Sequence, residues 1–165
     1  MIVTERLRLR EMTKNDEENL MEIFSDPIAM QYYPSTKTRE DAQRWIQWNL
    51  DNYQKHGAGL WICEVKENGM FVGQCGIVPQ IVDGVPEMEI GYLFARTHWG
   101  NGYATEAAVA AKDFGFKELH QPKLISMIYK PNTPSIKVAE RVGMTLEKET
   151  LIKGRETLIY SIHAK

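Results

Sequence analysis

The residues best suited to chemistry form one short segment, Trp-Gly-Asn-Gly-Tyr-Ala-Thr-Glu, at positions 99–106. Gly100 and Gly102 stand just before an alanine-rich run with helical spacing, and residues 89–94 before them read as a strand. The first four N–H groups of a helix have no partner within it, and the helix dipole adds positive potential there. A strand that turns through glycines into a helix therefore predicts an anion site, suited to a phosphate or diphosphate.

The spacing of the glycines separates this segment from two familiar phosphate loops. A Walker loop needs Gly-Lys followed by Ser or Thr, and the sequence contains no such triplet. A dinucleotide fingerprint has glycine or alanine where Thr105 stands, and needs an acidic residue about 20 positions further on, whereas Glu118 comes too early. An ordinary glycine turn, or a nucleotide-binding protein with an unrelated phosphate loop, stays open from the glycines alone.

The surrounding segments predict strands and helices in mixed order. Alternation of leucines and arginines predicts a half-buried strand at residues 4–12, and Asn-Gly and Asp-Gly pairs mark hairpin turns. The expected strands are 4–12, 60–65, 70–78, 87–95, 124–129, 145–152 and 156–163; the expected helices begin at caps 13–16 and 38–41 and cover 105–116 and 135–141. About seven strands and four helices predict one α+β domain over residues 1–165.

Small residues recur along one face of the helix expected at 105–116. They are Ala104, Ala108, Ala111 and Gly115. Small side chains let a helix lie close to a sheet, so we expect close packing directly behind the glycine segment.

Composition limits the classes of protein that fit. The chain has 165 residues, 43% hydrophobic and 25% charged, and its net charge of -2 gives no broad electrostatic case for nucleic acid or an anionic membrane as partner. No apolar run approaches the roughly 20 residues that cross a bilayer, and residues 1–12 lack a signal-peptide core, so we expect a cytoplasmic protein. Cys63 and Cys75 lie in apolar runs and the four histidines are scattered, which predicts reduced, structural cysteines and no metal site.

Three segments together resemble the GNAT superfamily of acyl-CoA-dependent N-acetyltransferases. They are Glu-Ile-Gly-Tyr at 89–92, the segment 99–107, and Asn-Thr-Pro-Ser at 132–135 with Val-Gly-Met at 142–144. In the superfamily pattern Arg/Gln-x-x-Gly-x-Gly/Ala, Trp99, Gly102 and Ala104 take the marked positions. Tryptophan is usual there in the branch that the sequence resembles most, the ribosomal-protein N-terminal acetyltransferases RimJ and RimL. The resemblance implies the GNAT fold, with a single mixed, mostly antiparallel seven-stranded sheet flanked by about four helices.

The resemblance also implies acetyl-CoA as cosubstrate, held mainly by backbone groups. The diphosphate would bind along the glycine segment, and the pantetheine arm would pair with the edge of the strand that ends near Phe94. The Leu93 amide would face the developing oxyanion, and Asn132 would hydrogen-bond the arm. The expected cofactor-binding residues are Tyr92, Leu93, Phe94, Trp99, Gly100, Asn101, Gly102, Tyr103, Ala104, Thr105, Asn132 and Ser135.

The reaction implied is transfer of an acetyl group to a primary amine by direct attack in a ternary complex. Glu89 is the candidate general base, because partial burial would raise the pKa of its carboxyl group; a structural acid on the strand is the other explanation. Glu87, on the same strand face, is the alternative base. Ser135 is the candidate for protonating or hydrogen-bonding the leaving thiolate, since the superfamily's usual tyrosine is Ala139 here, and N-capping is its alternative role.

The acceptor itself is left open by the sequence. It would be a protein N-terminus or a small amine or amino acid, and Tyr32, Tyr33 and Glu87 are expected to line its pocket. A non-catalytic acyl-CoA-binding or regulatory domain with the same fold is the alternative function, which the missing tyrosine keeps open. The resemblance is compatible with a monomer or a homodimer.

Overall fold

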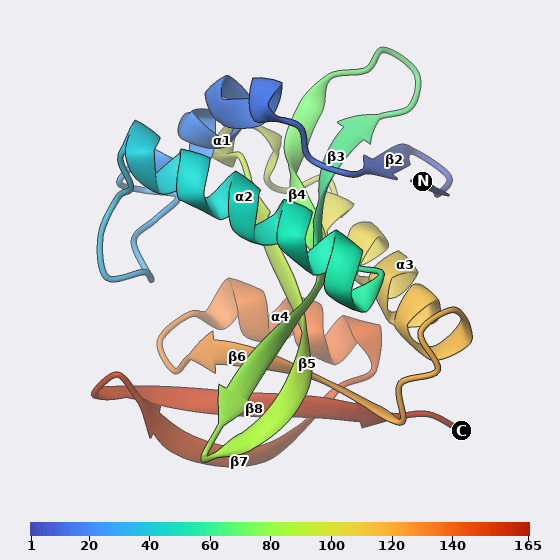
Figure 1. The fold of residues 1–165 in the computed structure, drawn as a ribbon. Coiled ribbons are helices and arrows are strands. Elements are labelled where there is room, and N and C mark those ends of the chain that lie inside the picture. Colours follow the sequence, from blue (N-terminus) through green and yellow to red (C-terminus); the bar gives the residue numbers. More distant parts are fainter.

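One eight-stranded sheet forms the centre of the molecule (Figure 1). The computed structural model describes all residues from 1 to 165. The strand order is β1-β2-β3-β4-β5-β6-β8-β7, and every neighbouring pair is antiparallel except β5 and β6. The strands are β1 (Ile2–Val3), β2 (Leu7–Arg10), β3 (Leu60–Val65), β4 (Phe71–Val82), β5 (Val85–Phe94), β6 (Lys123–Tyr129), β7 (Thr145–Ile152) and β8 (Arg155–His163); the helices are α1 (Glu17–Phe24), α2 (Arg39–His56), α3 (Tyr103–Lys117) and α4 (Thr133–Val142).

The α+β class and the mixed, mostly antiparallel sheet are as predicted, but the sheet has eight strands rather than seven. The additional strand is β1, which folds back along β2. Two residues are too few to show alternation, so no pattern of residues predicts this strand. Several boundaries also differ from expectation: β2 covers only Leu7–Arg10 of the strand expected at 4–12, α3 begins at Tyr103, and β4 continues as far as Val82.

Helices cover both faces of the sheet. α2 packs on the face that carries Gln74, and α3 packs on the face that carries Ile77 (Figure 1). One hydrophobic core of 34 buried residues extends through both layers, so the helices and the sheet are packed as one body. None of the helices has both the length and the apolar character that crossing a membrane requires.

The small-residue face of α3 is confirmed as a close contact with the sheet. Ala108 and Ala111 are fully buried, and a Cβ atom placed on Gly115 would lie 2.8 Å from side-chain atoms of Ile77 and Leu124. That distance is shorter than real Cβ contacts allow. A larger side chain at Gly115 would require the ends of the Ile77 and Leu124 side chains to move, so the small residues let α3 lie directly against the sheet.

β5 and β6 separate soon after they meet. They are paired at one position, Glu89 opposite Ile125, and β6 then runs along β8 over its whole length. Figure 1 shows the long strands β4 and β5 crossing β6 and β8 rather than running beside them. The edge of β5 beyond Glu89 therefore faces an opening between the two halves of the sheet.

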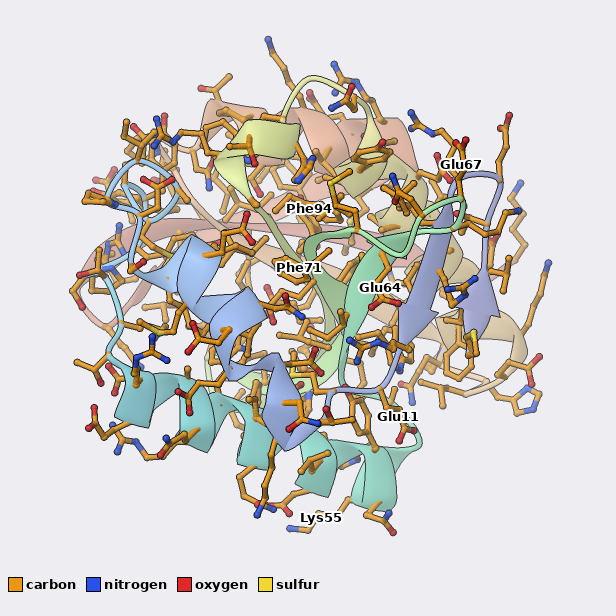
Figure 2. The ribbon with its side chains drawn as sticks, turned by 90° about the horizontal axis from the view of Figure 1, so that it is seen from above. Glu11, Lys55, Glu64, Glu67, Phe71 and Phe94 are labelled. Atoms are coloured by element: carbon orange, nitrogen blue, oxygen red, sulfur yellow. The ribbon has the colours of Figure 1, made fainter.

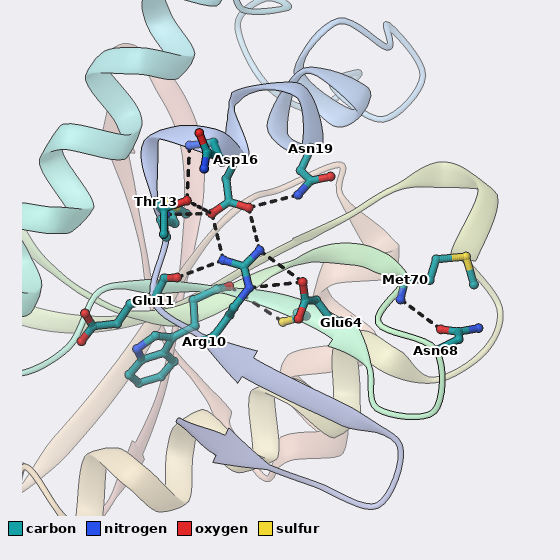
Figure 3. Close-up of polar contacts among 12 residues, drawn as sticks. Arg10, Glu11, Thr13, Asp16, Asn19, Glu64, Asn68 and Met70 are labelled. Atoms are coloured by element: carbon teal, nitrogen blue, oxygen red, sulfur yellow. Dashed lines mark hydrogen bonds and ion pairs between the residues drawn. The ribbon is translucent and has the colours of Figure 1, made fainter.

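A partly buried ion pair links β2 to the N-cap of α1. The guanidinium of Arg10 donates two hydrogen bonds to the carboxylate of Asp16, at 2.9 and 2.8 Å, and a third of 3.2 Å to Glu64 on β3 (Figure 3). Figure 2 shows the labelled side chains of Glu64, Phe71 and Phe94 from above; both phenylalanines belong to the buried core.

The same carboxylate caps the turn before α1. Asp16 accepts further hydrogen bonds from the Thr13 amide, at 2.8 Å, and from Asn19, at 3.0 Å. Burial disfavours the charge on Asp16, but the hydrogen bonds from Arg10, Thr13 and Asn19 outweigh it and hold the pKa of this carboxyl below its usual value. Asp16 is thus an ionised group that the fold surrounds with donors.

Replacing Asp16 should test how much the ion pair with Arg10 contributes to the free energy of unfolding. Asp16→Ala should lower the free energy of unfolding by about 3 kcal/mol, because it leaves a partly buried guanidinium short of its main partner. Glu149→Ala, which breaks a solvent-exposed pair with Lys130, should cost less than about 1 kcal/mol. Urea unfolding followed by circular dichroism measures both, and equal losses would contradict the assignment.

Candidate active site

The segment that joins β5 to α3 presents a row of main-chain N–H groups. Gly100 and Gly102 have φ angles of +84° and +77°, a region that favours glycine, and Gly102 is the N-cap of α3. None of the N–H groups of residues 100–105 donates to another protein group, and the first helical bond runs from Glu106 to the Gly102 carbonyl. With the helix dipole behind them, these groups can bind an anion.

Side chains brace this segment from within. The indole of Trp99 donates to the Phe94 carbonyl at 2.9 Å, and the Asn101 amide donates to the His98 carbonyl at 3.0 Å. Gly100 and Gly102 leave the outer side of the bend open, since a Cβ atom on Gly100 would meet nothing within 4 Å. The bend is therefore held in shape without its N–H groups being used.

The first turn of α3 is also tied to the N-terminus of the chain. Glu106 accepts hydrogen bonds from the Thr4 hydroxyl at 2.6 Å and from the amide and Nε of Arg6 at 2.8 and 2.7 Å. The Arg6 guanidinium stacks over the ring of Tyr103, 4.6 Å from its centroid. Sequence reasoning missed Arg6, because it stands 100 positions from Glu106 and no local pattern indicates that the two side chains meet.

A pocket of about 260 Å³ lies where β5 and β6 separate. α2 contributes Trp45 and Trp48 to one wall, and β5 contributes the opposite wall. Its lining comprises Tyr33, Trp45, Trp48, Leu60, Gln74, Val78, Gln80, Glu89, Ile90, Gly91, Tyr92, Leu93, Ser126, Met127, Ile128 and Ser135. Carboxylate, hydroxyl and amide groups thus meet inside a mainly apolar cavity, as is common in ligand sites.

Glu89 spans the gap between the separating strands. Its carboxylate accepts a 2.8 Å hydrogen bond from the Met127 amide on β6 and a 3.0 Å hydrogen bond from the Gln80 side chain on β4. Burial raises the pKa of Glu89 to about 7, even though both hydrogen bonds favour the ionised form. Near neutral pH this carboxyl group can therefore both accept and release a proton.

Glu87 has a different environment from Glu89. Its carboxylate forms an ion pair with Lys123 at 2.9 Å, and Lys123 also contacts Glu147 at 2.8 Å. Glu87 does not line the pocket. Of the two acids on this strand face, the structure brings Glu89 to the pocket and engages Glu87 in a structural ion pair.

The hydroxyl groups of Ser135 and Tyr92 are hydrogen-bonded to each other at the pocket. The Ser135 hydroxyl donates to the Tyr92 hydroxyl at 3.1 Å, and the Tyr92 hydroxyl donates to the Ser135 carbonyl at 2.7 Å. The N-cap of α4 is Asn132, whose side-chain oxygen accepts from the Ser135 amide at 3.2 Å. N-capping is thus the role of Asn132, and the Ser135 hydroxyl is left for the pocket.

The two tyrosines expected at the acceptor pocket are placed differently. Tyr33 lines the pocket; the protein atoms around its phenol, and then the charge of Glu89, raise its pKa to about 12. Tyr32 does not line the pocket, but its carbonyl accepts a 2.8 Å hydrogen bond from Arg155, which stacks on Tyr129 at 3.6 Å. Tyr32 therefore anchors the loop that carries Tyr33.

Comparison with known proteins shows the family to which the chain belongs. A family model described as "Acetyltransferase (GNAT) domain" matches residues 6–145. The chain belongs to the GNAT acetyltransferase family. It is an acetyl-CoA-dependent acyltransferase, as members of this family are.

Relatives of this GNAT acetyltransferase agree in sequence and fold. YkkB of Bacillus subtilis (strain 168) is 47% identical over 148 residues, which cover 89% of this chain and 86% of that protein. The crystal structure of an acetyltransferase from Agrobacterium tumefaciens matches with a TM-score of 0.87 at 31% identity, over 99% of this chain and 94% of that one. RimL, a ribosomal L7/L12 alpha-N-protein acetyltransferase solved with coenzyme A, matches with a TM-score of 0.80 over 98% and 96% of the chains, and its 17% identity shows the shared fold alone.

The acetyltransferase pocket also contains residues that sequence reasoning missed. They are two glutamines on β4: Gln80 donates to Glu89, and the buried side chain of Gln74 accepts a 2.9 Å hydrogen bond from the indole of Trp45. The two-residue turn at Asp83 and Gly84 fixes the register of β4 and β5, so counting back from it could have placed Gln80 opposite Glu87, on the same face as Glu89 and diagonal to it.

The titration of Glu89 can be observed in the acetyltransferase without any substrate. The Met127 amide donates to Glu89, so its proton resonance should move with a midpoint near pH 7 as the carboxylate forms and strengthens that bond. In Glu89→Gln this transition should vanish, while the Leu158 amide on β8 should be unaffected in either protein. Two-dimensional NMR from pH 5 to 9 provides the measurement, and a flat Met127 trace in the unaltered protein would exclude the raised pKa.

Proposed function

We propose that the protein transfers the acetyl group of acetyl-CoA to a primary amine by direct attack in a ternary complex. The acceptor is a protein N-terminus or a small amine or amino acid. The observation that carries the proposal is Glu89, a carboxyl group with a pKa of about 7 that lies in a pocket at the opening between β5 and β6. A group of this kind is suited to removing a proton from an amine near neutral pH.

Backbone groups of this chain would hold the cosubstrate, which supplies the activated acetyl thioester. The free N–H groups of residues 100–105 fit its diphosphate. Beyond Glu89 the edge of β5 is not paired with β6, so the main-chain groups of Tyr92 and Phe94, which point away from β4, can pair with the amides of a pantetheine arm. The side-chain N–H₂ of Asn132 is available to the same arm, because only its oxygen is used in capping α4.

Three groups would then act on the reacting atoms. Glu89 takes the proton that the amine loses as it attacks. A main-chain amide on the open edge of β5, that of Tyr92 or Phe94, donates to the carbonyl oxygen as negative charge develops there, because the Leu93 amide that the resemblance implied for this role faces β4. The Ser135 hydroxyl donates a hydrogen bond to the leaving sulfur, while the aromatic wall formed by Tyr33, Trp45 and Trp48 keeps water away from the amine.

Removing the base should separate catalysis from binding. Glu89→Gln should reduce turnover by at least about 100-fold and leave CoA affinity unchanged, because the amide cannot accept the proton. Glu87→Gln is the matched control on the same strand face and should keep most activity. Thiol release from acetyl-CoA with a panel of free amines and N-terminal peptides gives the rates, and calorimetry gives the affinity.

The same assay has a pH dependence with a defined sign. The rate in the unaltered enzyme should rise through pH 7 as Glu89 loses its proton and should level off once Glu89 and the amine are both deprotonated. A flat profile from pH 6 to 9, or full activity in Glu89→Gln, would refute Glu89 as the base. CoA binding without turnover of any amine would favour the non-catalytic alternative.

The diphosphate site can be tested at Gly102. Gly102→Val should weaken CoA binding by at least about tenfold, because a branched side chain disfavours a φ of +77° and displaces the N–H groups beside it. Gly69→Val is the control, since Gly69 has a φ of +74° in an exposed turn far along the chain from the site. Calorimetry should show tight binding of CoA but not of ATP or NAD, and unchanged CoA affinity in Gly102→Val would reject the assignment.

A further inference from the structure

Two hydroxyl groups from different elements meet inside the pocket. Tyr92 extends from β5 and Ser135 from the first turn of α4, and their oxygens are 3.1 Å apart. No other hydroxyl pair is formed there, because Ser126 donates to the Ile90 carbonyl at 2.7 Å. α4 itself offers no second donor one turn further on, where Ala139 is fully buried.

The protons of this pair are constrained by the short contacts. Tyr92 has one proton, which it gives to the Ser135 carbonyl at 2.7 Å, so the proton on the hydrogen bond between the two hydroxyls belongs to Ser135. The Ser135 amide is already engaged by Asn132. The orientation of the Ser135 hydroxyl is thus set by Tyr92 and not by helix capping.

A second proton arrangement is available to the same atoms. The Ser135 carbonyl lies inside α4, where it accepts a hydrogen bond from the amide four residues further on. It therefore keeps a hydrogen-bond donor when the Tyr92 O–H rotates away from it. Ser135 can then point its proton at a third atom in the pocket while Tyr92 donates to the Ser135 oxygen. Hydroxyls linked in this way polarise each other, which strengthens the outer hydrogen bond.

We propose that Tyr92 is a positioning residue for the leaving group, acting through Ser135 on the sulfur of the departing thiolate. This inference rests on the proposed function. When the C–N bond forms, Glu89 takes the amine proton, and when the C–S bond breaks, its electron pair goes to sulfur. Ser135 donates a hydrogen bond to that sulfur and Tyr92 donates to Ser135, with no proton transferred. The thiolate takes its proton from water on release, and Glu89 returns its own to solvent.

The pair explains how a serine can assist a thiolate. A serine hydroxyl is too weak an acid to give up its proton near neutral pH, and burial raises the pKa of the Tyr92 phenol as well. Both groups therefore stay protonated and act as donors. A pair of oriented donors in a cavity that excludes water can stabilise charge at the sulfur as it develops.

The first test is Tyr92→Phe, which keeps the ring and removes the hydroxyl. Turnover with acetyl-CoA should fall about tenfold while CoA affinity stays within about twofold. Tyr53→Phe is the matched control, because the Tyr53 hydroxyl is also buried, accepts from the Met12 amide and donates to the Leu60 carbonyl, but does not reach the pocket. Tyr53→Phe should lose stability and keep its rate.

The second measurement isolates the leaving group. With the acetyl thioester of a more acidic arylthiol, the ratio of kcat/KM between the unaltered enzyme and Tyr92→Phe should shrink to about twofold, since that thiolate needs little help. Tyr92→Phe added to Ser135→Ala should cost nothing further, because the pair acts as a unit.

The outcomes separate this inference from the proposed function. Unchanged turnover in Tyr92→Phe, an equal loss with both thioesters, or a loss that adds in full to that of Ser135→Ala would each overturn the role of Tyr92. An unaltered enzyme that acetylates no amine overturns the proposed function instead, and the inference falls with it.

Discussion

The pairing of β5 with β6 at a single position is the constraint on which the site depends. If β6 continued beside β5, the pocket would be filled by a regular ladder and the edge beyond Glu89 would have no free groups. The strands instead separate, and the carboxylate of Glu89 accepts from the Met127 amide across the gap. The Glu89 side chain thus takes the place of a main-chain hydrogen bond between the strands, and it is also the titratable group of the pocket. The hydrogen bond between Met127 and Glu89 thus both links the two strands and holds the proposed base in place.

The second requirement is that the anion site lie at the same opening. Close packing of α3 contributes, because Ala108, Ala111 and Gly115 let the helix lie directly against the sheet whose strand β5 leads into the anion site. Glu106 and Arg6 then tie the first turn to the start of the chain. The free N–H groups of residues 100–105 are held by contacts that do not involve them, which keeps them preorganised for a ligand.

The parts of this arrangement that are local in the chain could be predicted from the sequence. Two glycines between a strand and a helix identified the anion site, and alternation and turn residues identified seven of the eight strands. The choice between Glu87 and Glu89 could not be made in the same way. Both lie on one strand face, and what distinguishes them are Lys123 and Met127, more than thirty positions away in sequence.

Ser135 shows a different limit of sequence reasoning. Asn132 and Ser135 are both good capping residues, and they stand three apart at the start of one helix. Which of them caps is decided by the backbone at Asn132, and only that geometry frees the serine hydroxyl. Its partner Tyr92 comes from another strand, so residue type alone pointed to the serine but not to the pair.

The carboxyl groups of Glu89 and Asp16 act on stability in opposite directions. The folded state raises the pKa of Glu89 from 4.5 to about 7, so the stability it contributes is complete below about pH 4.5 and is lost as the pH rises through 7. The folded state lowers the pKa of Asp16, so its contribution is present above the ordinary pKa of 3.8 and is lost as the pH falls. Near neutrality the ionised Asp16 supports the fold while the ionising Glu89 works against it. A base for an amine needs a raised pKa, and burial of the Glu89 carboxyl group provides it at a cost in folding free energy. The hydrogen bonds to the ionised Asp16 stabilise the fold in the same pH range and help to offset that cost.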